Sequence, residues 1–245
     1  IRNLTKVLKG KTVLSDVSLD IPGGKTTVVI GQSGVGKSVL VKHIVGLMKP
    51  DQGSVFVGDV EVNSLDDRAL NRLRKKFGML FQGGALFGSM SVGDNVAFPL
   101  VKHTQLKDSE IQDIVAEKLR LVGMPGTEHY NPSELSGGMR KRVALARAIV
   151  MDPEVVVFDE PTSGLDPVTG DAIDRLILDT QARLGITYIV ISHDIKSTFK
   201  IAHAIGMLYQ SKLVAYGPKE EIRKASNDIL SQFFEGRSDG PIKVL

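Results

Sequence analysis

One eight-residue stretch constrains this chain more than any other. Residues 31–38 read Gly-Gln-Ser-Gly-Val-Gly-Lys-Ser and fit the pattern G-x-x-x-x-G-K-[ST] at every fixed position. The β-branched residues 26–30 before it indicate a buried strand, and residues 39–45 after it can continue as a helix. Strand, glycine-rich loop and helix in this order bind phosphate, because the loop N–H groups and the helix N-terminus both point at the anion.

The polar residues of this loop have separate chemical tasks. Lys37 is expected to reach the β- and γ-phosphates of a nucleotide as a point charge, and Ser38 to give its hydroxyl to Mg²⁺. The alternative is an ordinary glycine-rich turn, which the flanking strand and helix disfavour.

Composition excludes several classes of protein. The 245 residues suffice for one large or two small domains, and 42% apolar with 24% charged residues is typical of globular proteins. The chain has no cysteine, so disulfides, thiolate metal sites and cysteine nucleophiles are excluded. No apolar run approaches about 18 residues, so we expect no membrane span. The chain begins at Ile1 without a signal-like segment, and its natural start is expected to lie upstream.

The basic residues do not indicate a nucleic-acid site. The net charge is +3, and the densest basic cluster lies within residues 72–76. A solvated helix face explains this cluster, while nucleic-acid binding would favour interleaved aromatic residues or a long basic run. We therefore expect no nucleic-acid partner.

The order of the predicted elements favours an α/β fold. The first third combines antiparallel strands, at 13–21 and a hairpin at 54–60, with the loop-and-helix unit. The middle of the chain, about 83–151, is predicted to be mostly helical. It includes a helix over 109–122 that begins with a capping box of Ser109 and Gln112. Strands then alternate with helices, which predicts a mainly parallel sheet. These later elements cover about 138–150, 155–158, 167–184, 187–191, 195–202, 205–209 and 212–216.

Four polar residues follow predicted strands, at the edge where open α/β sheets bind ligands. Asp159 is expected to hold Mg²⁺, and Glu160, pointing elsewhere, to polarise water. Gln82, at the end of the buried strand predicted over 77–81, can touch the metal and the attacking water, and His193 can reach a γ-phosphate. The structural alternatives are turn acids, a surface amide and a histidine that only makes hydrogen bonds.

A second phosphate-binding device is predicted at residues 136–138. Ser136 and two glycines open a helix, which makes another anion-binding N-terminus, although an N-cap with a flexible turn would look the same. Asp166 before Pro167 is likewise explained locally as an N-cap. Two such devices on one chain require either two nucleotides or one nucleotide shared between two chains.

In this order the motifs resemble the nucleotide-binding subunit of ABC transporters over nearly the whole chain. The resemblance implies a P-loop ABC ATPase core with a mainly parallel sheet, an N-terminal antiparallel β-subdomain and an inserted helical subdomain at about 83–151. Residues 1–228 would form the ATP-binding domain, and 229–245 a C-terminal tail. The active form would be a head-to-tail homodimer that holds two ATP molecules with Mg²⁺.

The resemblance also implies roles for individual residues. Catalysis would fall to Glu160, His193, Gln82 and Lys37. ATP would be bound by Gly31, Gln32, Ser33, Gly34, Val35, Gly36, Lys37, Ser38 and Val39. The other subunit would contribute Ser136, Gly137, Gly138, Met139 and Asp166. Mg²⁺ would be held by Ser38, Gln82 and Asp159.

Among the ABC proteins, this sequence resembles the Mla-type, MCE-linked phospholipid transporter ATPases. The similarity lies at Met139 and in the stretches 80–87, 95–100, 232–236 and 239–241. It implies a place on the cytoplasmic face of the inner membrane, with an integral membrane permease contacting residues 82–90. An MCE-domain lipid-binding protein and a small regulatory subunit are the further partners it allows. The tail beyond Ile229 would reach the partner ATPase or dock on its own domain.

One departure concerns the nucleobase. ABC ATPases usually stack adenine on an aromatic residue near the first strand, and residues 6–13 contain none. Leu8 and Val13 are the candidate apolar contacts, with polar contacts from Lys9 or Lys11. We therefore expect loose selectivity for adenine.

Two other functions remain open from sequence. One is an importer of polar solutes, and the other is a soluble ABC-type clamp. Clamps of DNA repair carry a long coiled coil between phosphate loop and signature, and the translation factors carry two ATPase units. This chain has one unit and no heptad run between Lys37 and Ser136, which disfavours a clamp.

Overall fold

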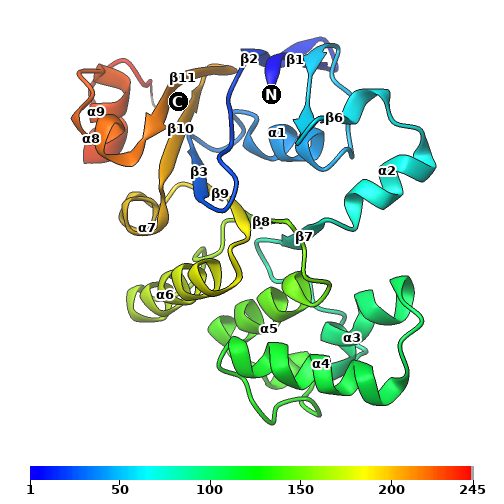
Figure 1. Ribbon diagram of the computed structural model, residues 1–245. Helices are drawn as coiled ribbons and strands as arrows, with labels where there is room; N and C mark the ends of the chain where they lie inside the picture. The colour runs from blue at the N-terminus through cyan, green and yellow to red at the C-terminus, as the bar shows by residue number, and fades with distance from the viewer. Residues whose placement is uncertain (244–245) are drawn as a thin grey trace. The chain divides into compact units, whose positions relative to one another are not determined.

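A computed structural model describes residues 1–243, so Val244 and Leu245 of the predicted tail lie outside the described residues. The chain divides into two compact units, and each is described on its own (Figure 1). The first comprises Ile1–Pro22, Thr26–Leu70 and Ile191–Leu245. The second comprises Gly23–Lys25 and Asn71–Val190.

The first unit begins with the predicted antiparallel strands. β1 (Arg2–Leu8) pairs with β2 (Lys11–Val17) and β4 (Gln52–Ser54), both antiparallel. The β1–β2 turn has positive φ at Lys9 and Gly10, which matches the twist of a tight hairpin. A smaller hairpin joins β5 (Phe56–Val57) to β6 (Val60–Glu61), followed by a 3₁₀ turn, η1 (Val62–Ser64).

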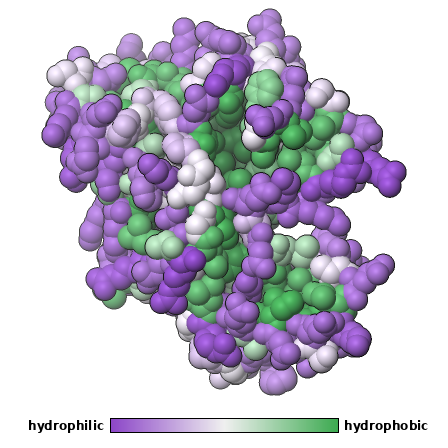
Figure 2. All heavy atoms as spheres, in the orientation of Figure 1, coloured by the Kyte–Doolittle hydropathy of each residue, from purple (hydrophilic) through white to green (hydrophobic). Residues whose placement is uncertain are grey.

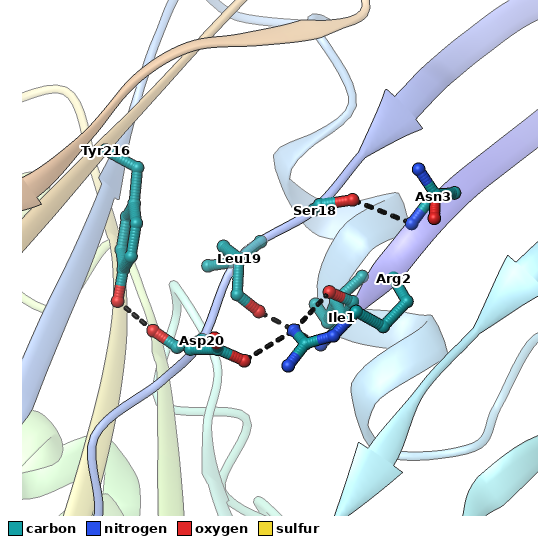
Figure 3. Close-up of polar contacts among 7 residues, drawn as sticks. All are labelled: Ile1, Arg2, Asn3, Ser18, Leu19, Asp20 and Tyr216. Carbon is teal, nitrogen blue, oxygen red and sulfur yellow. Dashed lines mark hydrogen bonds and ion pairs between the residues drawn. The ribbon is translucent and has the colours of Figure 1, made fainter.

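Polar contacts fix the path of the chain beyond β2 (Figure 3). The Arg2 guanidinium pairs with the Asp20 carboxylate at 2.5 Å and holds the pKa of that carboxyl below its usual value. The Asn3 N–H donates to the side-chain oxygen Ser18 Oγ at 2.8 Å, in place of a main-chain bond between strands. The Tyr216 hydroxyl donates to the Asp20 carbonyl. The strand predicted over 13–21 therefore ends at Val17.

The rest of the first unit surrounds the glycine loop. β3 (Thr26–Ile30) is buried at every position and pairs parallel with β10 (Ala204–Tyr209). β10 pairs antiparallel with β11 (Lys212–Pro218). The helices of this unit are α1 (Lys37–Ile44), α7 (Ile195–Ile201), α8 (Lys219–Lys224) and α9 (Asp228–Glu235). The chain enters the second unit through α2 (Asp67–Arg74).

In the second unit β7 (Phe77–Leu80) and β8 (Val155–Asp159) run parallel. Their register pairs Phe77 with Val155 and Leu80 with Phe158, so the two strands end side by side. β9 (Thr187–Ser192) follows α6 (Pro167–Leu184) and lies next to β8.

Three helices pack together in the second unit (Figure 1): α3 (Val92–His103), α4 (Asp108–Leu121) and α5 (Gly137–Ile149), with η2 (Pro132–Glu134) before α5. All three helices lie within the predicted helical stretch. α3 was not predicted as a separate helix, and Pro99 lies inside it. The capping box predicted for α4 at Ser109 and Gln112 is wrong, since Glu110 instead accepts the Lys107 N–H at 2.8 Å.

The described part of the tail docks on its own unit. α9 buries Leu230 and Gln232, and the Gln232 side chain bonds both main-chain groups of Ile242, at 2.7 and 2.9 Å. Phe234 packs edge-on against Phe199 with ring centroids 5.0 Å apart. A contact of this tail with a second subunit stays a prediction. Within residues 1–243, no helix combines the length and the apolar character needed to cross a membrane.

Candidate functional site

The phosphate loop of the first unit has the predicted strand–loop–helix form. It follows β3, and α1 begins at Lys37. Lys37 is 7% exposed, and its ammonium donates to the carbonyl oxygens of Gly31 at 2.6 Å and Gln32 at 2.9 Å. These bonds curl the loop around its own lysine.

The glycines of the loop leave no room for side chains at two positions. A Cβ at Gly36, where φ is 112°, would lie 2.7 Å from the Val13 carbonyl oxygen. A Cβ at Gly31, where φ is 147°, would overlap the Leu208 carbonyl oxygen. The loop thus lies closely against β2 and β10, and this packing sets its shape.

The three residues predicted to hold Mg²⁺ are divided between the units, with Ser38 in the first and Gln82 and Asp159 in the second. Ser38 is exposed at the start of α1, and Asp159 is half-buried at the end of β8. Within residues 1–243, no group of three or more histidines, cysteines, aspartates or glutamates could hold a metal by itself. A hydroxyl, an amide and one carboxylate suit Mg²⁺, because this ion takes few protein ligands and adds water and phosphate oxygens.

The candidate base-binding residues lie on the β1–β2 hairpin. Val13 Cγ1 lies 3.3 Å from the Cβ position of Gly36, so this side chain borders the phosphate loop. Leu8 is half-buried beside the turn, and Lys9 and Lys11 are exposed. The hairpin therefore offers aliphatic and cationic side chains to a nucleobase, and its role in binding stays a prediction.

His193 lies in the first unit, between β9 and α7, with its side chain exposed. The next residue, Asp194, caps α7 by accepting the Ser197 N–H at 3.0 Å. The histidine is thus presented on the turn that leaves the carboxyl end of β9.

In the second unit the ends of β7 and β8 come together with the turn that follows β8. The Gln82 amide approaches Ser163 Oγ at 3.4 Å, and the Ser163 N–H donates to the Glu160 carbonyl at 3.2 Å. Glu160 has a φ of +51°, a left-handed conformation that strains a residue with a side chain. Such strain persists where the surroundings over-determine it, typically at functional sites.

The two segments predicted to meet the nucleotide of a second subunit, 136–139 and Asp166, are neighbours in the second unit. Ser136 caps α5 by accepting the Met139 N–H at 3.3 Å. A Cβ at Gly138 would lie 2.6 Å from Thr169 Cγ2, so the start of α5 packs closely on α6. Asp166 caps α6 through the N–H groups of Val168 and Thr169, both at 3.0 Å, and hydrogen bonds from Thr169 lower the pKa of its carboxyl.

The local capping roles of Ser136 and Asp166 are therefore both present in the single chain. Gly137 joins the same packing, since a Cβ there would lie 3.1 Å from Leu165. Contact of these residues with a nucleotide across a dimer stays a prediction.

Three polar residues of the second unit had no predicted role. Lys141 on α5 is 5% exposed and donates to the carbonyls of Gln82 and Glu160. Burial lowers the pKa of its ammonium, while the nearby carboxylates of Asp159 and Glu160 raise it. The only sequence signal is that Lys141 lies four residues before the apolar Leu145, on the buried face of α5.

Arg147 and Asn95 hold the loop after Gln82. Arg147 donates to the carbonyls of Gly84 and Ala85, each at 2.8 Å. Asn95 is fully buried on α3, accepts the Phe87 N–H at 2.8 Å and donates to carbonyls of the same loop. The apolar loop predicted to face a partner is thus a fixed structure within its unit.

Comparison with known proteins assigns the family. The family model described as ABC transporter matches residues 14–163, from β2 to the turn after β8. The chain belongs to the ABC transporter family. This family hydrolyses ATP to drive transport, so the chain is an ABC ATPase.

Relatives align over nearly all of this ABC ATPase. It is 44% identical over 242 residues to the "Probable ribonucleotide transport ATP-binding protein mkl" of Mycobacterium leprae (strain TN), covering 99% of this chain and 70% of that protein. It is 40% identical over 243 residues to the "Intermembrane phospholipid transport system ATP-binding protein MlaF" of Haemophilus influenzae, covering 99% and 92%. The protein of the same name from Escherichia coli (strain K12) is 39% identical over 241 residues, covering 98% and 90%.

Solved structures confirm the predicted fold class. The ATP-binding cassette MJ0796, in a dimeric structure of a post-hydrolysis state bound to ADP and Pi, has a TM-score of 0.80 and 30% identity, covering 89% of this chain and 97% of that one. The protein cbiO1 from Clostridium perfringens, part of the ABC transporter complex cbiONQ, has a TM-score of 0.85 and 30% identity, covering 91% and 89%. The α/β ABC ATPase fold, with a mainly parallel sheet and antiparallel N-terminal strands, is therefore correct.

Replacing Lys37 tests the phosphate loop. In Lys37→Ala, ATP hydrolysis should fall by about 10²–10³-fold, because the γ-phosphate loses its positive partner. Steady-state hydrolysis and equilibrium binding of a fluorescent ATP analogue measure the loss. Lys42→Ala removes an exposed lysine from the same helix and should leave both values unchanged. Unchanged hydrolysis in Lys37→Ala would disprove the assignment of this loop.

Nucleotide selectivity tests the absence of an aromatic stacking residue. The kcat/KM for GTP should lie within about 10-fold of that for ATP, because aliphatic contacts from Leu8 and Val13 discriminate weakly between bases. Leu8→Tyr should lower KM for both nucleotides by supplying a ring for stacking. A preference for ATP of about 100-fold or more in the unmodified protein would contradict the prediction.

Proposed function

We propose that this ABC ATPase is the motor subunit of a phospholipid transporter on the cytoplasmic face of the inner membrane. The observation that carries the proposal is the 39–40% identity to proteins named MlaF, over 98–99% of this chain and 90–92% of theirs. The relatives at 44% identity carry a different name, for ribonucleotide transport, so import of a polar solute is the second candidate.

Each unit has its own task in the proposed hydrolysis of ATP. In the first unit, residues 31–39 bind the phosphates, and Lys37 and His193 neutralise charge that develops on the γ-phosphate. In the second, Glu160 orients the attacking water and accepts its proton, while Gln82 positions the same water. Mg²⁺ would be held by Ser38, Gln82 and Asp159, and would stabilise the negative charge on the phosphates.

A second copy of the chain completes the proposed site. Ser136 is exposed at the N-terminus of α5, a 13-residue helix whose partial positive charge suits a phosphate. Val168, next to the exposed Asp166, is 80% exposed, which is unusual for a large apolar side chain. Both features are explained if Ser136–Met139 and Asp166 meet the nucleotide of the partner subunit.

A groove in the second unit suits the permease. It is a cavity of about 880 Å³ between the loop after Gln82, α3 and the end of α5. Its apolar lining includes Phe77, Met79, Phe81, Phe87 and Phe98. Figure 2 shows apolar surface around α3 set among hydrophilic side chains.

The polar residues of this groove are all neutral or basic. They are Asn71, Arg74, Lys75, His103 and Arg147. Phe81 and Phe87 are each 42% exposed, although both are large and apolar. Such a surface fits a helix of the permease that has an apolar face and acidic ends. An MCE-domain protein and a small regulatory subunit would join the complex through the permease or through other surfaces.

Replacing Glu160 tests the catalytic assignment. Glu160→Gln should bind ATP and accumulate closed dimers, with turnover lowered by about 10²–10⁴-fold, because the amide cannot accept the proton of water. Size-exclusion chromatography with ATP and a phosphate-release assay measure the two effects. Glu154→Gln makes the same change at the other end of β8 and should behave as the unmodified protein. Wild-type turnover in Glu160→Gln would remove its role.

Co-purification from solubilised membranes tests the transporter itself. We expect a permease and an MCE-domain protein, together with ATP hydrolysis that responds to added phospholipid. A permease with a soluble substrate-binding protein, and stimulation by nucleotides or other polar solutes instead, would favour the second candidate. Recovery of ribosomes or DNA would overturn both.

A further inference from the structure

A buried lysine joins α5 to the ends of the two strands that carry the proposed catalytic groups. Lys141 lies five residues after Ser136, and its ammonium donates to the main-chain oxygen of Gln82 and, at 3.2 Å, to that of Glu160. Gln82 and Glu160 each lie just beyond a strand end, β7 and β8. One side chain therefore bonds to the main chain just beyond the carboxyl ends of both parallel strands.

Burying this ammonium costs free energy that its hydrogen bonds must offset. A charged amine removed from water is tolerated only when its N–H groups find acceptors. With 5% of Lys141 exposed, the two carbonyls supply these acceptors. An apolar side chain would fill the same space without that cost, so packing alone does not explain a lysine here.

The bond to Glu160 acts on a strained residue. Glu160 adopts a φ of +51°, and this conformation sets the direction in which its carboxylate leaves the chain. The Ser163 N–H also donates to the Glu160 carbonyl, at 3.2 Å. The Lys141 side chain and the Ser163 main chain thus both donate to the same peptide oxygen.

The same helix also holds the first residues of the loop that follows Gln82. Arg147, six residues beyond Lys141 on α5, donates to the carbonyls of Gly84 and Ala85. α5 is a continuous helix from Gly137 to Ile149, so its N-terminal signature, Lys141 and Arg147 move together. A displacement of the signature is therefore passed to Gln82 and Glu160 through Lys141.

We propose that Lys141 is a positioning residue for ATP hydrolysis: it ties the main chain of Gln82 and Glu160 to the signature helix, so that the Glu160 carboxylate is aligned only when α5 is in place. The inference rests on the proposed role of Glu160. It adds a link within one subunit between the segment that meets the partner's nucleotide and the residues that act on the subunit's own water.

Two methionine variants separate positioning from stability. Lys141→Met keeps the length of the side chain and removes its donors. Lys118→Met is the matched control, because Lys118 is also 5% exposed in the second unit but donates to the Asp152 carboxylate, at 2.7 Å. Lys141→Gln keeps an N–H₂ group that can donate to a carbonyl, and should recover part of any loss.

Hydrolysis is measured on the isolated full-length chain as kcat and KM for ATP, with thermal melting of each variant. We expect kcat in Lys141→Met to fall by about 10–100-fold with KM within threefold, since misplacing a catalytic group by about 1 Å costs on this scale. Lys118→Met should lower the melting temperature and leave kcat within twofold of the unmodified protein. If Lys141→Met does not fold, Lys141→Gln is compared with Lys118→Gln by the same measurements.

The proposal is overturned if kcat in the Lys141 variant stays within twofold of that in its Lys118 counterpart, or if KM rises in proportion to the loss of kcat/KM. Glu160→Gln, assayed in parallel, keeps the two assignments apart. Loss of turnover in Glu160→Gln with normal kcat in Lys141→Met would refute the positioning role alone. Normal turnover in Glu160→Gln would refute the catalytic assignment on which it rests.

Discussion

Backbone carbonyls at the ends of strands need hydrogen-bond donors, and in this chain two buried lysines supply them. In the first unit Lys37 donates to carbonyls of the phosphate loop, and in the second Lys141 donates to the carbonyls of Gln82 and Glu160. An ammonium group suits this task because it offers three N–H donors in a small volume. The curl of the loop and the turn after β8 both depend on such a bond.

Sequence predicted the elements whose ends are set by local chemistry. β3 and α6 were predicted with their observed bounds, because a β-branched run and an Asp-Pro start mark them directly. α3 was not predicted as a separate helix: its start has a capping box of Ser91 and Asp94, but Pro99 inside it is a residue that disfavours helix interiors. α4 was given the wrong cap, because the sequence favoured Ser109 as the capping acceptor, whereas in the structure the Glu110 carboxylate accepts the Lys107 N–H at 2.8 Å.

The candidate site residues were predicted from local sequence patterns, whereas the residues that hold them in place were not predicted. A glycine loop, strand-end acids and a signature are local patterns. Lys141 donates to main-chain oxygens 59 and 19 residues away, and Arg147 to main-chain oxygens 62 and 63 residues away. These partners are brought close only by tertiary packing. Asn95 accepts an N–H eight residues before it. Such residues resemble surface or capping residues until their partners are known. Ser136 and Asp166 are the converse case, because their capping bonds are local and their contact with a partner's nucleotide stays a prediction.

The hydrogen bonds of Gln232 have a consequence for how this protein can diverge. Its amide recognises the backbone of Ile242, which every amino acid except proline presents in the same way. The hydrophilic residues between them can therefore be exchanged without changing the path of the chain. Gly236 and Gly240 are exceptions. Gly236 ends α9 with a φ of 64°, and at Gly240, where φ is 138°, a Cβ would lie 2.5 Å from Gln232 Oε1. The exposed side chains of this segment can thus change, and come to fit new partners, while its backbone path stays the same.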